Sequence, residues 1–335
     1  MGSVRSAVIR GMATCLQRAG LTAPVARAAA YGRRVAAFPV LKYHRVNDEA
    51  DPFFPALAPE VFERQMALIA RTYVVLPVEE LVERTQRGTL PRNALAITFD
   101  DGYRDNLTHA APILARYGLS ATIFLATGLI GASHAPWFDR LAEAFKGTRA
   151  DGYVAPWGQV LPLDTLGARL SALGQMQDYM KQLSDDELQR TLEMVQVRLG
   201  VSEGERRKSS MLSWDDVHAL RGLGFTIGAH TVSHPILSRV SRDRAEAEIR
   251  ESRATITSVL GQAPRAFAYP NGKPADYNTM VSLLVRDAGF SCAVTTRFGV
   301  NTPATPPFEL RRGGPWEDHL PTFALKLALY RLTQA

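Results

Sequence analysis

The sequence predicts an α/β fold, a distorted (β/α)7-type barrel with one inserted segment near residues 131–210. Short apolar runs bounded by turn residues alternate with segments of helical period, which is typical of a parallel sheet covered by helices. Polar motifs follow directly after several of these runs, at the strand ends where such barrels carry their functional groups. The stretch 131–210 interrupts this alternation and is therefore interpreted as an insertion.

Six apolar runs are predicted to be strands because each is short and ends at a polar cluster. They are Val40–His44, Ala94–Phe99, Ala121–Leu125, Phe225–Ala229, Ala266–Tyr269 and Cys292–Thr295. Four segments between them have helical period: Pro59–Arg71, Asn106–Tyr117, Arg242–Leu260 and Asn278–Ala288. Ser241 and Gly261 flank the third of these segments as N-cap and C-terminal stop.

The insertion contains the apolar residues Trp137, Phe138 and Leu141, a Gly/Pro-rich piece over 152–162, and a helical stretch over 185–199. Two interpretations remain open for this segment. It is either a lid over a binding face or a subdomain that packs on the barrel without contacting a ligand.

The positive net charge of +6 is confined to the N-terminus. Eight of the 39 basic residues precede Asp48, the first acidic residue, so the remainder has 31 basic against 33 acidic residues. A general nucleic-acid-binding surface is therefore not expected. The two cysteines, Cys15 and Cys292, lie far apart, which argues against a disulfide framework or a thiolate zinc site.

Residues 1–36 form a basic N-terminal segment preceding the barrel domain, which is assigned to residues 37–335. Arginines interrupt the apolar residues of this segment, so we recognise neither a cleavable signal nor a transmembrane helix and expect a cytoplasmic protein. The segment is either a surface helix or frayed terminus, or an amphipathic helix in weak peripheral contact with an anionic membrane.

Two aspartates, Asp100 and Asp101, follow the run Ala94–Phe99 and precede Gly102. Neighbouring residues of a regular strand point to opposite faces. Both carboxylates therefore serve one site only where the strand breaks, and Gly102 supplies such a break. A simple turn at the end of the strand is the alternative explanation.

Two histidines, His230 and His234, lie four residues apart after another predicted strand. In one helical turn this spacing places both side chains on one face, about 5–6 Å apart. Two histidines and one carboxylate, with water in the fourth position, form the ligand set of a catalytic zinc site. A structural role for the pair would leave the aspartates unexplained.

The motifs Thr98–Gly102, His230–His234 and Arg265–Pro270, in this order, resemble the first three motifs of the polysaccharide deacetylase family, carbohydrate esterase family 4. The resemblance covers roughly Pro39 to Gly314. It implies a metal-dependent hydrolase that removes N-acetyl groups from an amino sugar in an oligosaccharide, a polysaccharide or a lipid-linked glycan. The expected partner is thus an N-acetylated glycan.

The same resemblance implies that Asp100 is the general base and that Asp101, His230 and His234 hold the metal. The chemistry requires this division, because one carboxylate must stay off the metal to accept a proton from the attacking water. Arg265 would hold Asp100 ionised and oriented, since a neighbouring cation lowers a carboxylate pKa. A surface ion pair is the alternative for this arginine.

Further binding residues are expected from the resemblance. Tyr269 lies where the family uses a backbone N–H to stabilise an oxyanion. Phe267 and Trp316 are candidates for walls of the sugar groove, although core packing is the alternative for both. Arg312 resembles a late arginine that lies near the site in related chains.

The general acid is the point at which the sequence departs from the family pattern. Many relatives have a Leu-x-His motif near the C-terminus, whereas His319 lacks that leucine. His44 is therefore preferred, because it ends an apolar strand and should project at the same rim as Asp100 and His234. A packing role beneath the site is the alternative for His44.

The most suitable metal is zinc, and cobalt, nickel or iron would suit the same ligand set. Two other functions remain open from the sequence. One is hydrolysis of another linear or cyclic amide on the same scaffold. The other is a carbohydrate-binding protein that has lost catalysis, although none of the four expected reacting residues is missing.

Overall fold

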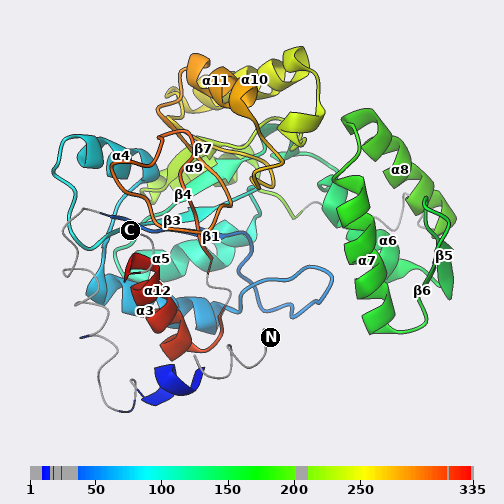
Figure 1. Cartoon of the computed structure of the whole chain (residues 1–335), viewed down its shortest axis with the longest axis horizontal. Helices are drawn as coiled ribbons and strands as arrows, with labels where there is room; N and C mark the ends of the chain where they lie inside the picture. The colour runs from blue at the N-terminus through cyan, green and yellow to red at the C-terminus, as the bar shows by residue number, and fades with distance from the viewer. Residues whose placement is uncertain are drawn as a thin grey trace.

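The computed structural model describes residues 10–15, 18, 24, 37–200, 210–314 and 317–332. These residues contain a parallel sheet of seven short strands surrounded by helices (Figure 1). The strands are β1 (Val40–Tyr43), β2 (Val74–Val75), β3 (Ala94–Phe99), β4 (Thr122–Leu125), β7 (Thr226–Ala229), β8 (Ala266–Ala268) and β9 (Cys292–Val294). The fold is an α/β half-barrel, as predicted.

The strand order is β1-β3-β4-β7-β8-β9, with β2 paired to the start of β3. Every residue of β3 is buried, as expected for a parallel strand covered on both sides. All six predicted strands are present within one residue of their predicted ends. β2 was missed because two residues are too few to show a period.

The segment 310–313, called the closing segment below, links the two edge strands β1 and β9. Leu310 bridges Val294 of β9, and Gly313 bridges Leu41 of β1, both in parallel. Their backbone hydrogen bonds run from Leu310 N to Ala293 O at 3.0 Å and from Gly313 N to Val40 O at 2.9 Å. This closing segment therefore holds β1 and β9 on either side of one site.

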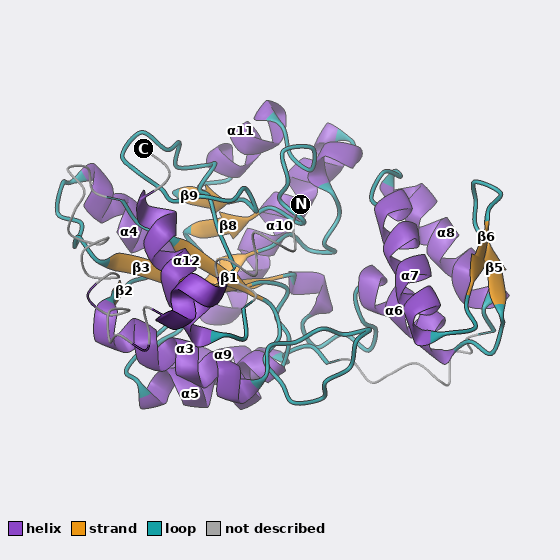
Figure 2. Ribbon diagram, turned by 60° about the horizontal axis from the view of Figure 1, so that its bottom comes forward, coloured by secondary structure: helices purple, strands orange, loops and turns teal. Residues whose placement is uncertain are grey.

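Helices surround the strands, with α3, α5 and α9 on one side and α10 and α11 on the other (Figure 2). The helices of the barrel are α3 (Pro59–Thr72), α4 (Val78–Gln86), α5 (Ala111–Arg116), α9 (Trp214–Gly222), α10 (Arg242–Leu260), α11 (Thr279–Asp287) and α12 (Leu320–Leu332). The caps predicted for α10 are confirmed: Ser241 Oγ accepts from Arg244 N at 3.2 Å, and Gly261 is left-handed with φ 68°.

The predicted helix Asn106–Tyr117 begins as a π-helical turn, η1 (Asn106–Ala110), and continues as α5. Ala111 donates to Asn106, five residues back. Pro112 follows, and it has no N–H with which to continue the ordinary i to i−4 pattern. The change of pitch is thus attributable to the proline.

The inserted segment forms a separate lobe beside the barrel, drawn in green in Figure 1. It contains α6 (Trp137–Gly147), the antiparallel pair β5 (Gly152–Val154) and β6 (Val160–Pro162), α7 (Leu166–Met180) and α8 (Asp185–Arg198). Its buried apolar side chains form their own cluster, in which Phe53 and Phe54 from the loop after β1 also take part. The interruption predicted from the sequence is therefore a packed lobe.

Most of residues 1–36 lie outside the described residues, so the interpretation of that segment stays a prediction. Within the described ranges, none of the helices combines the length and the apolar character required to cross a bilayer.

Candidate active site

Asp100 and Asp101 follow β3 and face one cavity because the chain turns sharply there. Asp100 N still donates to Tyr43 O at 3.1 Å, whereas Asp101 and Gly102 have φ values of 74° and 91°. A side chain at Gly102 would lie 2.8 Å from Ile130 Cδ1. The strand break expected at Gly102 thus begins one residue earlier and directs both carboxylates to the carboxyl end of the sheet.

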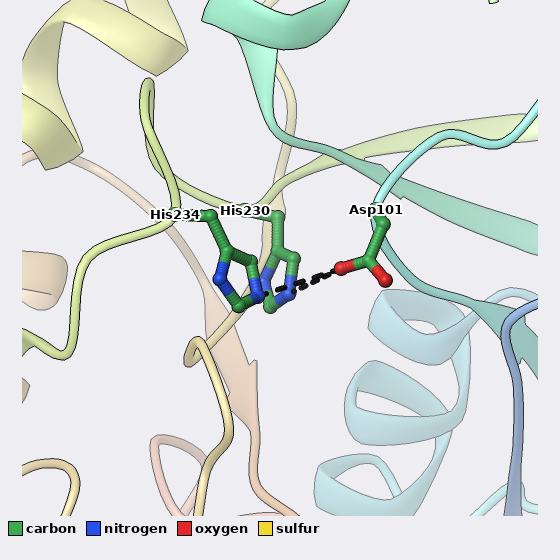
Figure 3. Close-up of side chains that lie close together, drawn as sticks. All are labelled: Asp101, His230 and His234. Carbon is green, nitrogen blue, oxygen red and sulfur yellow. Dashed lines mark ion pairs between the residues drawn. The ribbon is translucent and has the colours of Figure 1, made fainter. Parts of the chain in front are cut away.

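Asp101, His230 and His234 converge on one point at this end of the sheet (Figure 3). Asp101 Oδ1 lies 3.5 Å from His230 Nε2 and 3.4 Å from His234 Nε2. An ion with tetrahedral bonds of about 2.0–2.1 Å separates two ligand atoms by about 3.3 Å. The three buried side chains therefore fit a divalent metal ion with little adjustment.

The protonation of both histidines suits metal binding. His230 Nδ1 lies 2.7 Å from the carbonyl oxygen of Ala268, which assigns the proton to Nδ1 and leaves Nε2 as the ligand atom. Burial, together with the neighbouring His230, lowers the pKa of His234 to about 4. His234 is consequently uncharged at neutral pH, as a ligand must be.

The histidines lie on a loop after β7 and not on the helical turn that their spacing suggested. Thr231 and His234 have φ values of 69° and 61°, which a helix does not permit. Their rings nevertheless meet at 4.8 Å between centroids. The expected proximity is present, but it arises from an irregular backbone.

Glu248 of α10 stabilises the loop that carries His230 and His234 by accepting hydrogen bonds from it. Its buried carboxylate accepts from Val232 N at 2.7 Å, Ser233 N at 2.9 Å and Ser233 Oγ at 2.6 Å. Arg244, one helical turn earlier, lies 2.7 Å from Glu248 Oε1 and balances its charge. The loop that presents both histidines is therefore fixed by a side chain outside the recognised motifs.

Arg312, in the closing segment, forms a two-point ion pair with Asp100. Its Nη1 and Nη2 donate to Asp100 Oδ1 and Oδ2 at 2.6 and 2.8 Å, and both side chains are buried. Burial raises the pKa of the Asp100 carboxyl, but the charge and hydrogen bonds of Arg312, together with His230 and His44, outweigh this effect and hold the pKa well below its usual value. Asp100 is thus held as a carboxylate.

The prediction that Arg265 performs this task is wrong. Arg265 precedes β8, so it lies at the amino end of that strand, and its guanidinium is paired with Glu83 of α4. That edge is opposite the one at which Asp100 lies. The alternative considered for this residue, a surface ion pair, is the observed one.

His44, directly after β1, lies at the site. Its Nε2 is 3.9 Å from Asp100 Oδ2, and its side chain is 30% exposed toward the cavity. Burial lowers the pKa of the His44 ring, so the ring is uncharged at neutral pH. His319 lies elsewhere, at the start of α12, where Nδ1 is 2.8 Å from Thr322 Oγ1.

The expected aromatic and oxyanion residues require correction. Phe267 is fully buried in the barrel core and does not wall a groove. The N–H of Tyr269 donates to Val294 O at 3.2 Å within the sheet, and its hydroxyl donates to Phe308 O at 3.0 Å. Neither donor of Tyr269 is thus available to an oxyanion, and Trp316 lies outside the described residues.

Asn271, two residues later, is the better placed donor and was not singled out from the sequence. It lines the cavity with a φ of 57°, and its side-chain Nδ2 is buried without a partner among the described residues. Its position after Pro270, where the chain leaves the sheet, is the signal that could have identified it.

The cavity above these residues has a volume of about 320 Å³. The inserted lobe forms part of its wall through Trp137, Phe138 and Asp139 of α6 and through Gln177 and Lys181 near the end of α7. Phe138 packs edge-on against His234 at 5.2 Å between ring centroids. The inserted lobe therefore borders the cavity, which favours the interpretation of the insertion as a lid over a binding face.

Comparison with known proteins gives one relative by sequence and several structures of similar fold. YxkH of Bacillus subtilis is 37% identical over 101 residues, a match that spans 30% of this chain and 35% of that relative. The deacetylase PplD of Streptococcus pyogenes superposes with a TM-score of 0.56 at 20% identity over 83% of this chain and 92% of its own. IcaB of Ammonifex degensii superposes with a TM-score of 0.56 at 20% identity, over 88% of this chain and 97% of its own.

The structural likenesses support the fold, since their sequence identities are low. The family assignment comes from the sequence itself, because the model of the polysaccharide deacetylase family matches residues 87–293, more than half of the chain. The chain belongs to the polysaccharide deacetylase family.

Proposed function

We propose that the protein is a metal-dependent hydrolase that removes an N-acetyl group from an amino sugar of a glycan. One observation carries this proposal: a carboxylate held ionised by Arg312 lies beside an Asp-His-His cluster on the floor of one cavity. This combination supplies a base next to a metal site, which amide hydrolysis requires.

Asp101, His230 and His234 would hold the ion, with zinc as the first candidate and cobalt, nickel or iron as further ones. When bound, the ion activates a water molecule and polarises the scissile carbonyl. His230 and His234 offer neutral nitrogens and Asp101 one oxygen, a ligand set typical of hydrolytic zinc sites.

Asp100 would act as the general base. It is adjacent in sequence to a ligand but faces Arg312, which occupies both of its oxygens with hydrogen bonds and keeps the carboxylate deprotonated. A base that is ionised before the substrate arrives accepts the proton of the attacking water without a preceding titration step.

His44 would return a proton to the departing amine. Because burial lowers its pKa, the ring enters the reaction uncharged and must gain its proton during the cycle. Asp100, 3.9 Å away, is a nearby source once it has accepted the proton of the water. Asn271 would stabilise the oxyanion, since its unpartnered Nδ2 lines the cavity.

The decisive experiment combines elemental analysis of the purified protein with acetate release from N-acetylated oligosaccharides. We expect about one equivalent of metal, with metal loss in Asp101→Ala and His234→Ala. Asp100→Asn should keep the metal but lose turnover by two or more orders of magnitude.

Three results would contradict the proposal. The first is metal loss in Asp100→Asn together with an active Asp101→Asn. The second is ring opening of a cyclic amide without acetate release from any glycan. The third is tight glycan binding without hydrolysis by the metal-loaded protein, which would indicate a binding protein.

A further inference from the structure

Arg45 and Asp139 line the active-site cavity from different parts of the chain, and both contact Tyr103. Arg45 follows β1, whereas Asp139 lies in the first turn of α6, in the inserted lobe. The guanidinium carbon of Arg45 lies 4.7 Å from the centre of the Tyr103 ring, and the Tyr103 hydroxyl donates to both carboxylate oxygens of Asp139 at 3.2 Å. All three side chains are buried. These residues, called the polar cluster below, join the barrel to the lobe beside the cavity.

The polar cluster has hydrogen-bonding groups that the protein leaves unfilled. Among the residues that the structure describes, the Tyr103 hydroxyl is the single hydrogen-bond partner of the Asp139 carboxylate, which has about four lone-pair sites. Arg45 Nε donates to Asp105 Oδ2 at 3.2 Å, whereas the buried Nη1 has no partner in the described part of the chain. Buried donors and acceptors are costly without partners, so a ligand in the cavity is the group that would satisfy both residues.

The combination of a free donor and a free acceptor restricts the chemistry of that ligand. A hydroxyl group both donates and accepts, so hydroxyls would donate to Asp139 and accept from Arg45. An anion such as a phosphate would accept from Arg45 but be repelled by the carboxylate. Burial is the main cause that raises the pKa of Asp139 to about 7, although Arg45 and Tyr103 lower it. The protein therefore compensates a charge on this carboxyl only in part, and a hydroxyl donor would stabilise it.

Aromatic side chains surround the polar cluster. Phe54, whose ring centre lies 5.8 Å from the guanidinium carbon of Arg45, lines the cavity together with Trp137 and Phe138. Phe138 directly precedes Asp139 and packs against His234, so the polar cluster borders the Asp-His-His cluster. Apolar walls with a few convergent polar groups are typical of sites for small organic ligands. A sugar ring, with apolar C–H faces and hydroxyls at its edge, has this combination.

We propose that Arg45 and Asp139 bind hydroxyl groups of the sugar in the cavity and thereby determine which glycans the enzyme accepts. Tyr103 is a positioning residue, because it orients the Asp139 carboxyl. This inference rests on the proposed function and specifies its substrate class, a glycan whose hydroxyls near the acetamido group are free and uncharged. Asp139 belongs to the inserted lobe, so the insertion contributes directly to the choice of substrate.

The test uses the disaccharide of N-acetylglucosamine and its monodeoxy analogues, in which hydrogen replaces one hydroxyl at a time. Calorimetry with metal-loaded Asp100→Asn measures binding, and acetate release by the unmodified enzyme measures kcat/KM. At least one analogue should bind about 10- to 100-fold more weakly than the parent compound. Arg45→Met and Asp139→Ala should weaken binding of the parent by a similar factor, while removal of that hydroxyl then costs less than about threefold. The loss in kcat/KM should arise mainly from KM.

Both variants are designed to spare the fold. Arg45→Met keeps the apolar stem, and Asp105 retains hydrogen bonds from Asn47 Nδ2 at 2.8 Å and Asn106 Nδ2 at 3.1 Å. If Asp139→Ala does not fold, Asp139→Asn supplies a second test. It keeps the shape of the side chain and one acceptor oxygen, so it should lose the same discrimination in smaller measure.

Two exposed residues outside the cavity lining provide matched controls. Arg104 is 62% exposed and paired with Asp216 at 3.5 Å, and Asp164 is an exposed residue of the inserted lobe. Arg104→Met and Asp164→Ala remove the same charges, and both should retain full discrimination between the parent compound and its deoxy analogues.

A merely structural contact between lobe and barrel would give a different result. In that case Arg45→Met and Asp139→Ala would weaken the parent and every analogue by the same factor, which overturns the inference. Equal binding of all analogues by the protein with both residues intact overturns it as well. Acetate release without discrimination leaves the proposed function in place and rejects the hydroxyl site. Discriminating binding without acetate release does the reverse, and absence of both binding and hydrolysis rejects both.

Discussion

Replacing Arg312 by Met tests whether the closing segment controls the proposed base. Both partners of the ion pair are buried, with side-chain exposures of 0% for Arg312 and 4% for Asp100. Removing one partner of a buried pair leaves an uncompensated charge and typically costs about 3–5 kcal/mol. We therefore expect Arg312→Met to lower the free energy of unfolding by about that amount in urea titrations of the chelator-treated protein.

A double-mutant cycle separates the ion pair from simple loss of packing. In an Asp100→Asn background no charge is stranded, so Arg312→Met should cost less there, with a coupling energy of about 1–3 kcal/mol. Arg297→Met is a matched control, because Arg297 is paired with Glu309 at 3.0 Å while both side chains are more than a third exposed. That change should cost less than about 1 kcal/mol.

The pH dependence gives a second readout of the same variant. Because Arg312 keeps the pKa of Asp100 below its unfolded value, the pair stabilises the fold at every pH above that unfolded value, and this stabilisation is lost as pH falls through the folded pKa. Without Arg312, burial raises the pKa of Asp100, so the acid limb of kcat/KM should move to higher pH. The reasoning would be refuted if the effects of Arg312→Met and Asp100→Asn on the free energy of unfolding were additive and the acid limb of kcat/KM did not move in Arg312→Met.

Three other variants test the remaining roles. His44→Ala should cut turnover of an N-acetyl substrate roughly a hundredfold and affect an acetyl ester with a good leaving group much less; greater damage in His319→Ala would assign the acid there. Glu248→Gln should weaken metal affinity 10- to 100-fold in competition with a chelator, because the amide keeps one acceptor oxygen for the loop but loses the charge and places an NH2 donor against Ser233 Oγ or Arg244; unchanged affinity would show that the histidine loop does not depend on the Glu248 carboxylate. Arg265→Gln should change the free energy of unfolding by less than about 1 kcal/mol and leave kcat/KM unchanged; a loss like that of Arg312→Met would restore the role expected from the sequence.

The Asp-His-His cluster was predictable because each of its motifs follows a recognisable strand. Apolar runs such as Ala94–Phe99 mark strands by local composition, and parallel strands present their carboxyl ends at one edge. Asp101, His230 and His234 therefore meet at that edge, although Asp101 precedes the two histidines by more than a hundred residues. The conformation of the histidine loop was not predictable from spacing, because it depends on Glu248 of a later helix.

The roles expected for Arg265 and Tyr269 were wrong for reasons of strand direction and register. Arg265 begins its strand, so its side chain belongs to the amino edge, opposite Asp100. Arg312 lies in an irregular segment whose pairing with β1 and β9 no local pattern reveals. Tyr269 still donates within the sheet, whereas Asn271 lies beyond Pro270, where the pairing has ended. In each case a tertiary contact decides which group reaches the cavity.

The closing segment also determines when during synthesis the site can form. Arg312 and Asp100 are 212 residues apart, and β1 and β9 become linked only when residues 310–313 have been made. Until then the Asp100 carboxylate would be buried without its counter-charge, which the low-dielectric interior opposes. A ribosome-bound chain that already contains Asp101 and both histidines is therefore expected to lack an ionised base. The proposed base can therefore be ionised only after residues 310–313 have been made, later than the residues of the Asp-His-His cluster.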